Sequence, residues 1–94
     1  MYATIRTYTG AGDLLAALTR NQDSVRSLMS AVPGFRSYYF IATPDGDGSS
    51  ITVCDDEAGT GESNRVAAAW IAENLPGLSM APPVISAGEV AVAF

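Results

Sequence analysis

The sequence predicts a single α+β domain in which four strands and two helices follow one another in the order βαββαβ. Segments in which apolar residues occupy every second position, as in strands, alternate with segments whose apolar residues recur at helical spacing. Stretches rich in Gly and Pro separate most of these segments. The chain has 94 residues, the size of one domain, so we treat residues 1–94 as one unit.

The first strand is expected over residues 2–8, YATIRTY, where apolar and polar residues alternate. Residues 9–12, TGAG, end it, and Asp13 supplies a cap or first-turn carboxylate for a helix that runs to about Ala31. The buried face of this helix is formed by Leu14, Leu18, Val25, Leu28 and Met29. The polar pair Asn21-Gln22 interrupts that face, either because the helix bends and exposes the pair or because the pair lines a pocket.

The second strand, residues 35–43, is rich in aromatic residues. Pro33-Gly34 ends the preceding helix, and four of the eight aromatic residues of the chain follow: Phe35, Tyr38, Tyr39 and Phe40. Neighbouring side chains of a strand point to opposite faces, so both faces of this strand must be covered by apolar groups. The side chains expected to face the helices are those of Phe35, Tyr39 and Ile41, and those expected to face away are Tyr38 and Phe40.

The second half of the chain repeats the alternation. Residues 44–48, PDGDG, predict a turn into a strand over residues 49–55. The acidic residues Asp55, Asp56, Glu57 and Glu62 then favour the N-terminal end of a second helix. The buried face of this helix is formed by Val66, Ala67, Trp70, Ile71 and Leu75. Pro76-Gly77 ends the helix, and the last strand is expected over residues 84–94.

This order of elements predicts a ferredoxin-like fold, an antiparallel four-stranded sheet with both helices on one face. The other face also carries apolar residues, expected to be Tyr2, Tyr8, Ile85, Ala87, Ala91 and Ala93 with Tyr38 and Phe40. We therefore expect a homodimer, in which two sheets pack face to face as a barrel with the helices outside. Arg6 and Glu89, expected on adjacent central strands, either meet in or near the dimer core or are unrelated charges at its rim.

Composition excludes several classes of function. A net charge of −5 with five basic residues argues against binding to nucleic acid, which needs clustered positive charge. No apolar run is long enough for a membrane span, and the N-terminal residues show no secretory signal. The single cysteine, Cys54, cannot form an internal disulfide, and we read it as a small buried apolar residue. We expect a cytoplasmic protein.

The order of elements, the Pro33-Gly34-Phe35 entry to the second strand, the acidic run before the second helix and Trp70 together resemble the dimeric α+β-barrel superfamily. More narrowly, the chain is similar to small proteins of the antibiotic biosynthesis monooxygenase type. The resemblance implies a site between helices and sheet to which an Asn and a Trp contribute. Trp70 lies on the corresponding helix, and Asn64 near its start is the candidate Asn.

The resemblance also bears on cofactors. Some members are cofactor-independent oxygenases of aromatic polyketides, and others degrade haem that they hold through a His. This chain has no His, so haem degradation is disfavoured and we expect no cofactor. We expect no metal site either, because the consecutive carboxylates at positions 55–57 cannot all face one ion.

Each candidate site residue has a plainer interpretation. Trp70 lines a pocket or belongs to the core, and Phe35 and Tyr39 stack on a planar ligand or only pack. Arg36 holds an anionic oxygen of a ligand or is solvated. Two functions remain open: a cofactor-independent oxygenase of a planar aromatic substrate, or a non-catalytic homodimer that binds a small apolar ligand or has an accessory role.

Overall fold

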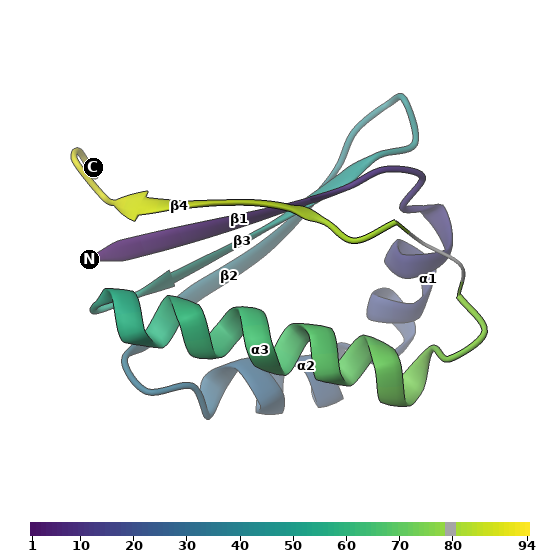
Figure 1. The fold of residues 1–94 in the computed structure, drawn as a ribbon, viewed down its shortest axis with the longest axis horizontal. Helices are drawn as coiled ribbons and strands as arrows, with labels where there is room; N and C mark the ends of the chain where they lie inside the picture. The colour runs from purple at the N-terminus through teal and green to yellow at the C-terminus, as the bar shows by residue number, and fades with distance from the viewer. Residues whose placement is uncertain (79–80) are drawn as a thin grey trace.

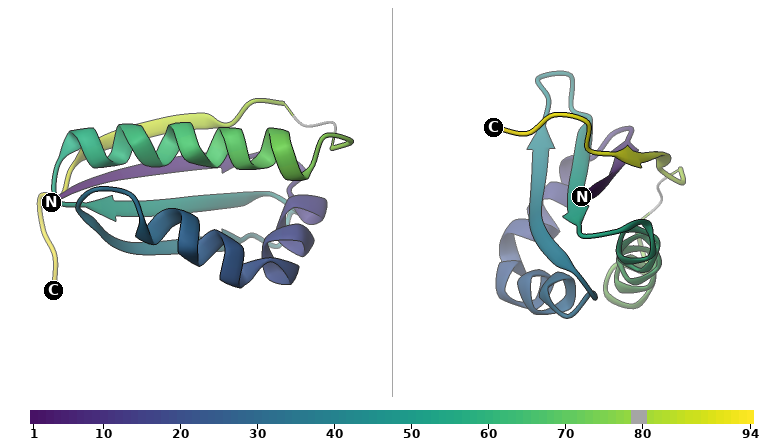
Figure 2. Two further views of the ribbon diagram at one scale, coloured as in Figure 1. Left: turned by 90° about the horizontal axis from the view of Figure 1, so that it is seen from below. Right: turned by 90° about the vertical axis from the view of Figure 1, so that its left-hand side faces the viewer.

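The structure, a computed structural model, describes residues 1–78 and 81–94. Its elements are β1 (Tyr2–Tyr8), α1 (Gly12–Arg20), α2 (Gln22–Ser30), β2 (Phe35–Ala42), β3 (Gly48–Cys54), α3 (Glu57–Asn74) and β4 (Val84–Glu89). The strands form one antiparallel sheet in the order β2-β3-β1-β4, and all the helices lie on one face of it (Figures 1 and 2). This architecture confirms the predicted ferredoxin-like fold.

The first helical segment is broken at Asn21, so the prediction of one continuous helix is wrong. The side-chain amide of Asn21 donates to the carbonyl oxygen of Ala17 at 2.7 Å and competes with helical main-chain hydrogen bonds. The chain resumes as α2 at Gln22. The two interpretations of the polar pair each hold for one residue. Asn21 is exposed where the helix breaks, and Gln22 lines a cleft.

The last strand is shorter than predicted. β4 ends at Glu89, which lies opposite Tyr2, the first residue of β1. Beyond this point the neighbouring strand offers only the carbonyl oxygen of Met1, which accepts from the amide of Val90 at 2.9 Å. Residues 91–94 therefore run past the sheet, as the yellow C-terminal end of Figure 1 shows.

The start of α3 is fixed tightly against the sheet. The carboxylate of Asp56 accepts a hydrogen bond from the amide of Gly59 at 3.1 Å and caps the helix. A Cβ atom on Gly59 would lie 2.6 Å from the carbonyl oxygen of Pro33 and 2.8 Å from the Cβ of Cys54. Glycine thus permits the close contact that sets the position of Asn64 and Trp70 further along the same helix.

The buried core lies between the helices and the sheet. One cluster joins α2 and α3 through Val25, Met29, Ala67 and Trp70. A second cluster lies at the end of β1 and the start of α1 and contains Tyr8, Ala11 and Leu14. Leu18 and Ile71 pack against both clusters, so the core is continuous beneath the helices.

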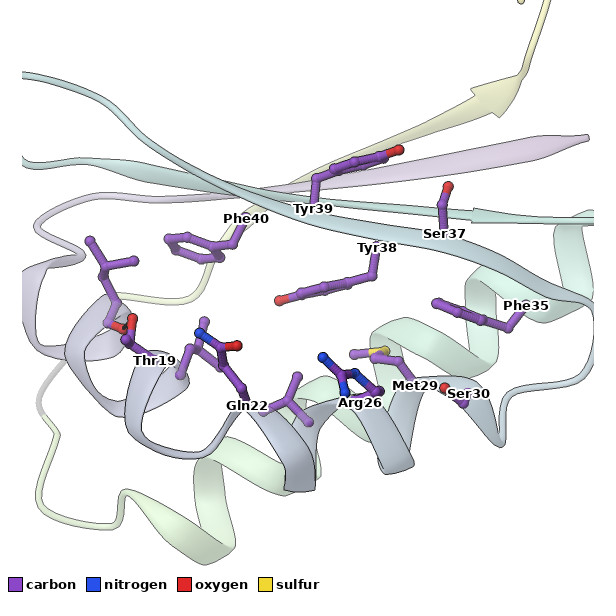
Figure 3. A pocket seen from close by; sticks show the side chains of 13 residues that line it. Thr19, Gln22, Arg26, Met29, Ser30, Phe35, Ser37, Tyr38, Tyr39 and Phe40 are labelled. Carbon is purple, nitrogen blue, oxygen red and sulfur yellow. Dashed lines mark hydrogen bonds between the residues drawn. The ribbon is translucent and has the colours of Figure 1, made fainter.

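Most side chains of β1 and β2 whose direction was predicted face the opposite side of the sheet in the structure. Arg6 and Tyr8 are buried beneath the helices, whereas Ile5 on the other side of β1 is 40% exposed. On β2, Tyr38 and Phe40 point toward the helices and Tyr39 points away, with 60% of its surface exposed (Figure 3). Their predicted orientations are therefore wrong, as is that of Ile41, which is exposed.

The orientation of Phe35 toward the helices is as predicted, and a β-bulge explains why it differs from its neighbours. Phe35 lies opposite Cys54 and Ser37 opposite Val53, so the register advances by two residues on β2 while it advances by one residue on β3. The extra residue, Arg36, shifts the alternation. Phe35 and Tyr38 therefore share a face although they are three residues apart.

The predicted approach of Arg6 and Glu89 is also wrong. β4 is an edge strand, and Glu89 lies opposite Tyr2, whereas Arg6 lies opposite Ile85. Arg6 lies inside the subunit, where its contacts are with β3 and α3. Its burial removes it from the sheet face on which a partner was expected.

Candidate ligand site between the helices and the sheet

An open cleft of about 560 Å³ separates β2 from α1 and α2 (Figure 3). Its volume is in the range of small-molecule sites, which are typically apolar with a few placed polar groups. The apolar lining consists of Leu15, Leu18, Val25, Met29, Phe35, Tyr38, Tyr39 and Phe40. The polar lining consists of Thr19, Gln22, Arg26, Ser30 and Ser37. The cleft can therefore receive a flat apolar molecule from solvent.

A second, much smaller void of about 20 Å³ lies deeper, between the sheet and α3. It is bordered by Arg6, Ser50 and Trp70, and it shares Tyr38 and Phe40 with the cleft. Those two rings form the wall between the cleft and the interior. The void is about the size of one water molecule, so the space beneath Trp70 is otherwise filled.

Arg6 is the most unusual side chain of the interior, with only 2% of its surface exposed. Its Nη1 donates to Oδ1 of Asn64 at 2.7 Å and its Nη2 to Oγ1 of Thr52 at 3.3 Å. Thr4 donates to the same Asn64 oxygen at 3.2 Å. Asn64 therefore links α3 to the central strand β1 and fixes the plane of the guanidinium group.

Tyr38 brings a phenol group to the same place. Burial raises the pKa of Tyr38 above its usual value of 10.0, while the positive charge of Arg6 acts in the opposite direction. The phenol is therefore protonated at neutral pH and is available as a hydrogen-bond donor. Arg6 thus places a fixed cation beside the inner void, and Tyr38, which borders both the void and the cleft, adds a neutral O–H group.

The candidate residues from the sequence are distributed as follows. Phe35 and Tyr39 border the cleft, although the ring of Tyr39 points away from the helices (Figure 3). Trp70 is in the core, where its Nε1 lies 3.4 Å from Oγ of Ser24. Asn64 lines neither the cleft nor the inner void, but its side chain accepts a hydrogen bond from Arg6, which borders the void. Arg36 does not line the cleft and pairs at the surface with Asp55.

Arg6 was expected at the dimer face rather than in the site. The sequence did carry a signal, because Thr4, Arg6 and Tyr8 alternate with Ala3 and Ile5 and must share a face. The face away from the helices was expected to carry Tyr2 and Tyr8, and by alternation Arg6 with them. The structure instead buries the face that carries the polar atoms.

The acidic residues before α3 have structural roles. Asp56 caps the helix and Asp55 pairs with Arg36. Within residues 1–78 and 81–94 there is no cluster of three side chains suited to hold a metal ion. Cys54 is buried, and burial raises the pKa of its thiol, with the charges of Asp56 and Asp55 adding to the effect. In the same described ranges, no helix is both long and apolar enough to cross a membrane.

No protein-family model matches the chain, and no curated protein does. Solved structures do match. A protein of unknown function from Nitrosomonas europaea is 24% identical, with a TM-score of 0.71 over 99% of this chain and 91% of that one. The ActVA-Orf6 monooxygenase of Streptomyces coelicolor, solved with nanaomycin D, is 19% identical, with a TM-score of 0.71 over 99% and 89%.

The haem degrader MhuD of Mycobacterium tuberculosis, solved with two haems in its active site, is 18% identical, with a TM-score of 0.71 over 100% and 99% of the two chains. At these identities the likeness shows the fold. It confirms the predicted resemblance to antibiotic biosynthesis monooxygenase-like proteins at that level, and this chain shares their ferredoxin-like architecture over almost its whole length.

Proposed function

We propose that the protein binds a planar aromatic molecule in the cleft and acts on it as a cofactor-independent oxygenase. The observation that carries this proposal is the cleft of about 560 Å³, walled on one side by the rings of Phe35, Tyr38 and Phe40. Aromatic walls favour stacking on a flat ligand. The structural neighbour from Streptomyces coelicolor is a monooxygenase solved with a small ligand, which supports the same use of this fold.

In such a reaction an electron-rich ligand reduces dioxygen itself, and the protein contributes binding, orientation and exclusion of water. Tyr38 and Phe40 would hold one edge of the ligand, and the aliphatic side chains of Val25 and Met29 on α2 would cover its ring. The cleft lining contains no His, so these residues do not fit the haem ligation of the His-containing members of the superfamily. The proposal therefore involves no haem.

A second function is favoured by one observation, the small size of the inner void. About 20 Å³ beneath Trp70 leaves no room for a ligand to react there unless side chains move. A protein that only binds its ligand in the outer cleft would need no such room. The two functions differ in a single measurement, the consumption of dioxygen by the protein with its ligand bound.

Binding can be tested with two matched variants on the same helix. Ser30 lines the cleft and Ser27 does not, and both are exposed. We expect Ser30→Phe to fill the cleft and weaken the binding of planar phenols at least about tenfold, which corresponds to roughly 1.4 kcal/mol. Ser27→Phe should leave the affinity unchanged. Equal affinities in both variants would place the ligand elsewhere, and bound ligand without dioxygen consumption would favour the non-catalytic function.

We also propose that the protein is a homodimer formed through the bare face of the sheet. Among the residues that the register pairs, none on this face is charged, and its members are Ala3, Ile5, Thr7, Ser37, Tyr39, Ile41, Ser49, Ile51, Val53, Val84, Ser86 and Gly88. The exposed bulge residue Arg36 has no partner in this register and is bound to Asp55. An uncharged face suits a second copy of an acidic chain, because its burial brings no like charges together. The exposed Val92 and Phe94 extend apolar surface beyond the sheet.

Sedimentation can test the dimer. Tyr39 lies midway along the edge strand β2 and is 60% exposed on the bare face, so Tyr39→Glu should place charge in the interface and yield a monomer at micromolar concentration. Ser27→Glu adds the same charge on a helix and should leave the dimer intact. A wild-type protein that sediments as a monomer at this concentration would contradict the proposal.

A further inference from the structure

Arg6 is a full positive charge in the protein interior, and the described part of the chain supplies no counter-charge to it. All ten acidic residues of the sequence lie within the described ranges 1–78 and 81–94, and none of their carboxylates is within 4.0 Å of the guanidinium nitrogens. The partners of Arg6 are neutral oxygens of Asn64 and Thr52. A buried charge compensated only in part is costly, and such groups are usually paired or occur at functional sites.

Two polar atoms at this place are unsatisfied, one of Arg6 itself and one of its neighbour Ser50. Within the described part of the chain, Nε of Arg6 and Oγ of Ser50 are buried and have no hydrogen-bond partner. Both residues border the void of about 20 Å³, together with the ring of Tyr38. Nε–H is a donor and the hydroxyl groups can donate, so the polar part of the lining offers donors and one positive charge, while the rest of the lining is apolar.

The position of the void connects this charge to the cleft. Tyr38 and Phe40 border both spaces, so a ligand stacked in the cleft has Arg6 behind its inner edge. About 20 Å³ accommodates one oxygen atom but not the two oxygens of a carboxylate. The space therefore fits a single deprotonated oxygen attached to a ring better than it fits a carboxylate.

We propose that Arg6 is the oxyanion subsite of the cleft, and that the ligand is a planar aromatic phenolate or enolate whose deprotonated oxygen accepts a hydrogen bond from Nε of Arg6. The proposal rests on the proposed function for the position of the ring and adds the charge and chemical class of the ligand. Asn64 is then a positioning residue, because it holds the guanidinium plane without touching the ligand.

This assignment gives the buried charge a role in the chemistry. A cation at the oxygen favours the ionised form of a phenol or enol, and the ionised form is the electron-rich form that can reduce dioxygen. The titratable side chains beside Arg6 are the phenols of Tyr8 and Tyr38. Among the described residues that border the void, none carries a carboxylate that would oppose the effect.

The test uses three small planar probes: 4-nitrophenol, its methyl ether 4-nitroanisole, and 4-nitrobenzoate. Above the pKa of the phenol, the wild-type protein should bind 4-nitrophenolate roughly 10- to 100-fold more tightly than 4-nitroanisole, as expected for a charge-assisted hydrogen bond. It should also bind the phenolate more tightly than the benzoate. The visible absorbance of bound 4-nitrophenol should show that its pKa is lowered.

Two variants separate the subsite from general effects of charge. Arg6→Met removes the buried cation, and Arg20→Met makes the same change at an exposed position that does not line the cleft. Arg6→Met should abolish both the preference for phenolate and the lowered pKa, whereas Arg20→Met should keep them. Because the charge is uncompensated, we expect Arg6→Met to unfold at the same temperature as the wild type or higher. A clear loss of stability would show that Arg6 also has a structural role, and the wild-type protein then decides whether it forms the subsite.

The wild-type measurements decide the proposal even if Arg6→Met does not fold. Equal affinity for 4-nitrophenolate and 4-nitroanisole would overturn the oxyanion subsite and leave the cleft as a binding site. If no probe binds, the proposed function fails, and the subsite is then tested with chloride, which should shift the NMR signal of the Nε–H group of Arg6. The absence of that shift would overturn the subsite as well.

Discussion

Replacing Gly59 by alanine should destabilise the protein, because the first turn of α3 has no room for a methyl group. The added Cβ would lie 2.6 Å from the carbonyl oxygen of Pro33, 2.8 Å from Cβ of Cys54 and 3.2 Å from its Sγ. The first two of these atoms belong to the main chain and to the root of a side chain on β3. They cannot move aside as the end of a flexible side chain could, so α3 must shift away from the sheet.

The magnitude follows from two opposing effects. Overpacking of this kind costs about 1–3 kcal/mol, whereas alanine in place of glycine favours the helix by up to about 1 kcal/mol. Two of the contacts would be shorter than 3.0 Å and involve atoms that cannot move aside, so we expect an overpacking cost of about 2–3 kcal/mol and a net loss of about 1–2 kcal/mol for Gly59→Ala. Gly61 lies two residues further along the same helix, where a Cβ would meet nothing within 4 Å. Gly61→Ala should therefore stabilise the protein by about 0.5–1 kcal/mol.

Urea denaturation followed by fluorescence measures both changes. Trp70 is the single tryptophan and is buried in the core, so its emission reports the unfolding of the region that α3 covers. A shift of α3 should also disturb the contact between Asn64 and Arg6, so Gly59→Ala should weaken the binding of phenolate probes. If Gly59→Ala were as stabilising as Gly61→Ala, the close packing of α3 on the sheet would be refuted.

Two other predictions concern the same region. Asp56→Ala removes the N-cap of α3 and should lower the free energy of unfolding by about 1 kcal/mol. Asp55→Ala breaks only an exposed ion pair with Arg36 and should lower it less. Equal losses for the two variants in urea titrations would contradict the capping role. Burial raises the pKa of Cys54 above 9.0 and the pKa of Tyr38 above 10.0. The unfolded chain therefore loses these protons first, and stability should fall as pH rises through and above about 9, a decline that Cys54→Ala should reduce.

Much of the fold could be predicted because local patterns are sufficient for it. The strand over residues 2–8 matches β1, and the Pro33-Gly34 boundary correctly separates the first helical region from β2. The break at Asn21 was missed because the helical spacing of the apolar residues continues across it, whereas the side-chain amide of Asn21 joins its main-chain N–H on the carbonyl of Ala17 only in the folded chain. The end of β4 depends on the length of the neighbouring strand, which the residues of β4 themselves do not encode.

The candidate site could be predicted only in part. Alternation along a strand shows which residues share a face, and Thr4, Arg6 and Tyr8 do so as expected. The pattern does not show which face meets the helices, and the face that carries Arg6 and Tyr8 was predicted to meet a second copy of the chain. The contact with Asn64, which lies 58 positions away in the sequence, became visible only in the folded chain.

The sequence by itself determined the order of the elements, the turns between them and which residues of β1 share a face, because these properties depend on neighbours within a few positions. The tertiary structure alone decided which way the sheet faces, where β2 shifts its alternation and which polar atoms are left without partners. These properties depend on how α3 and α1–α2 pack across the sheet. The buried charge of Arg6 is their result, since a side chain becomes an isolated interior cation only when distant segments close around it.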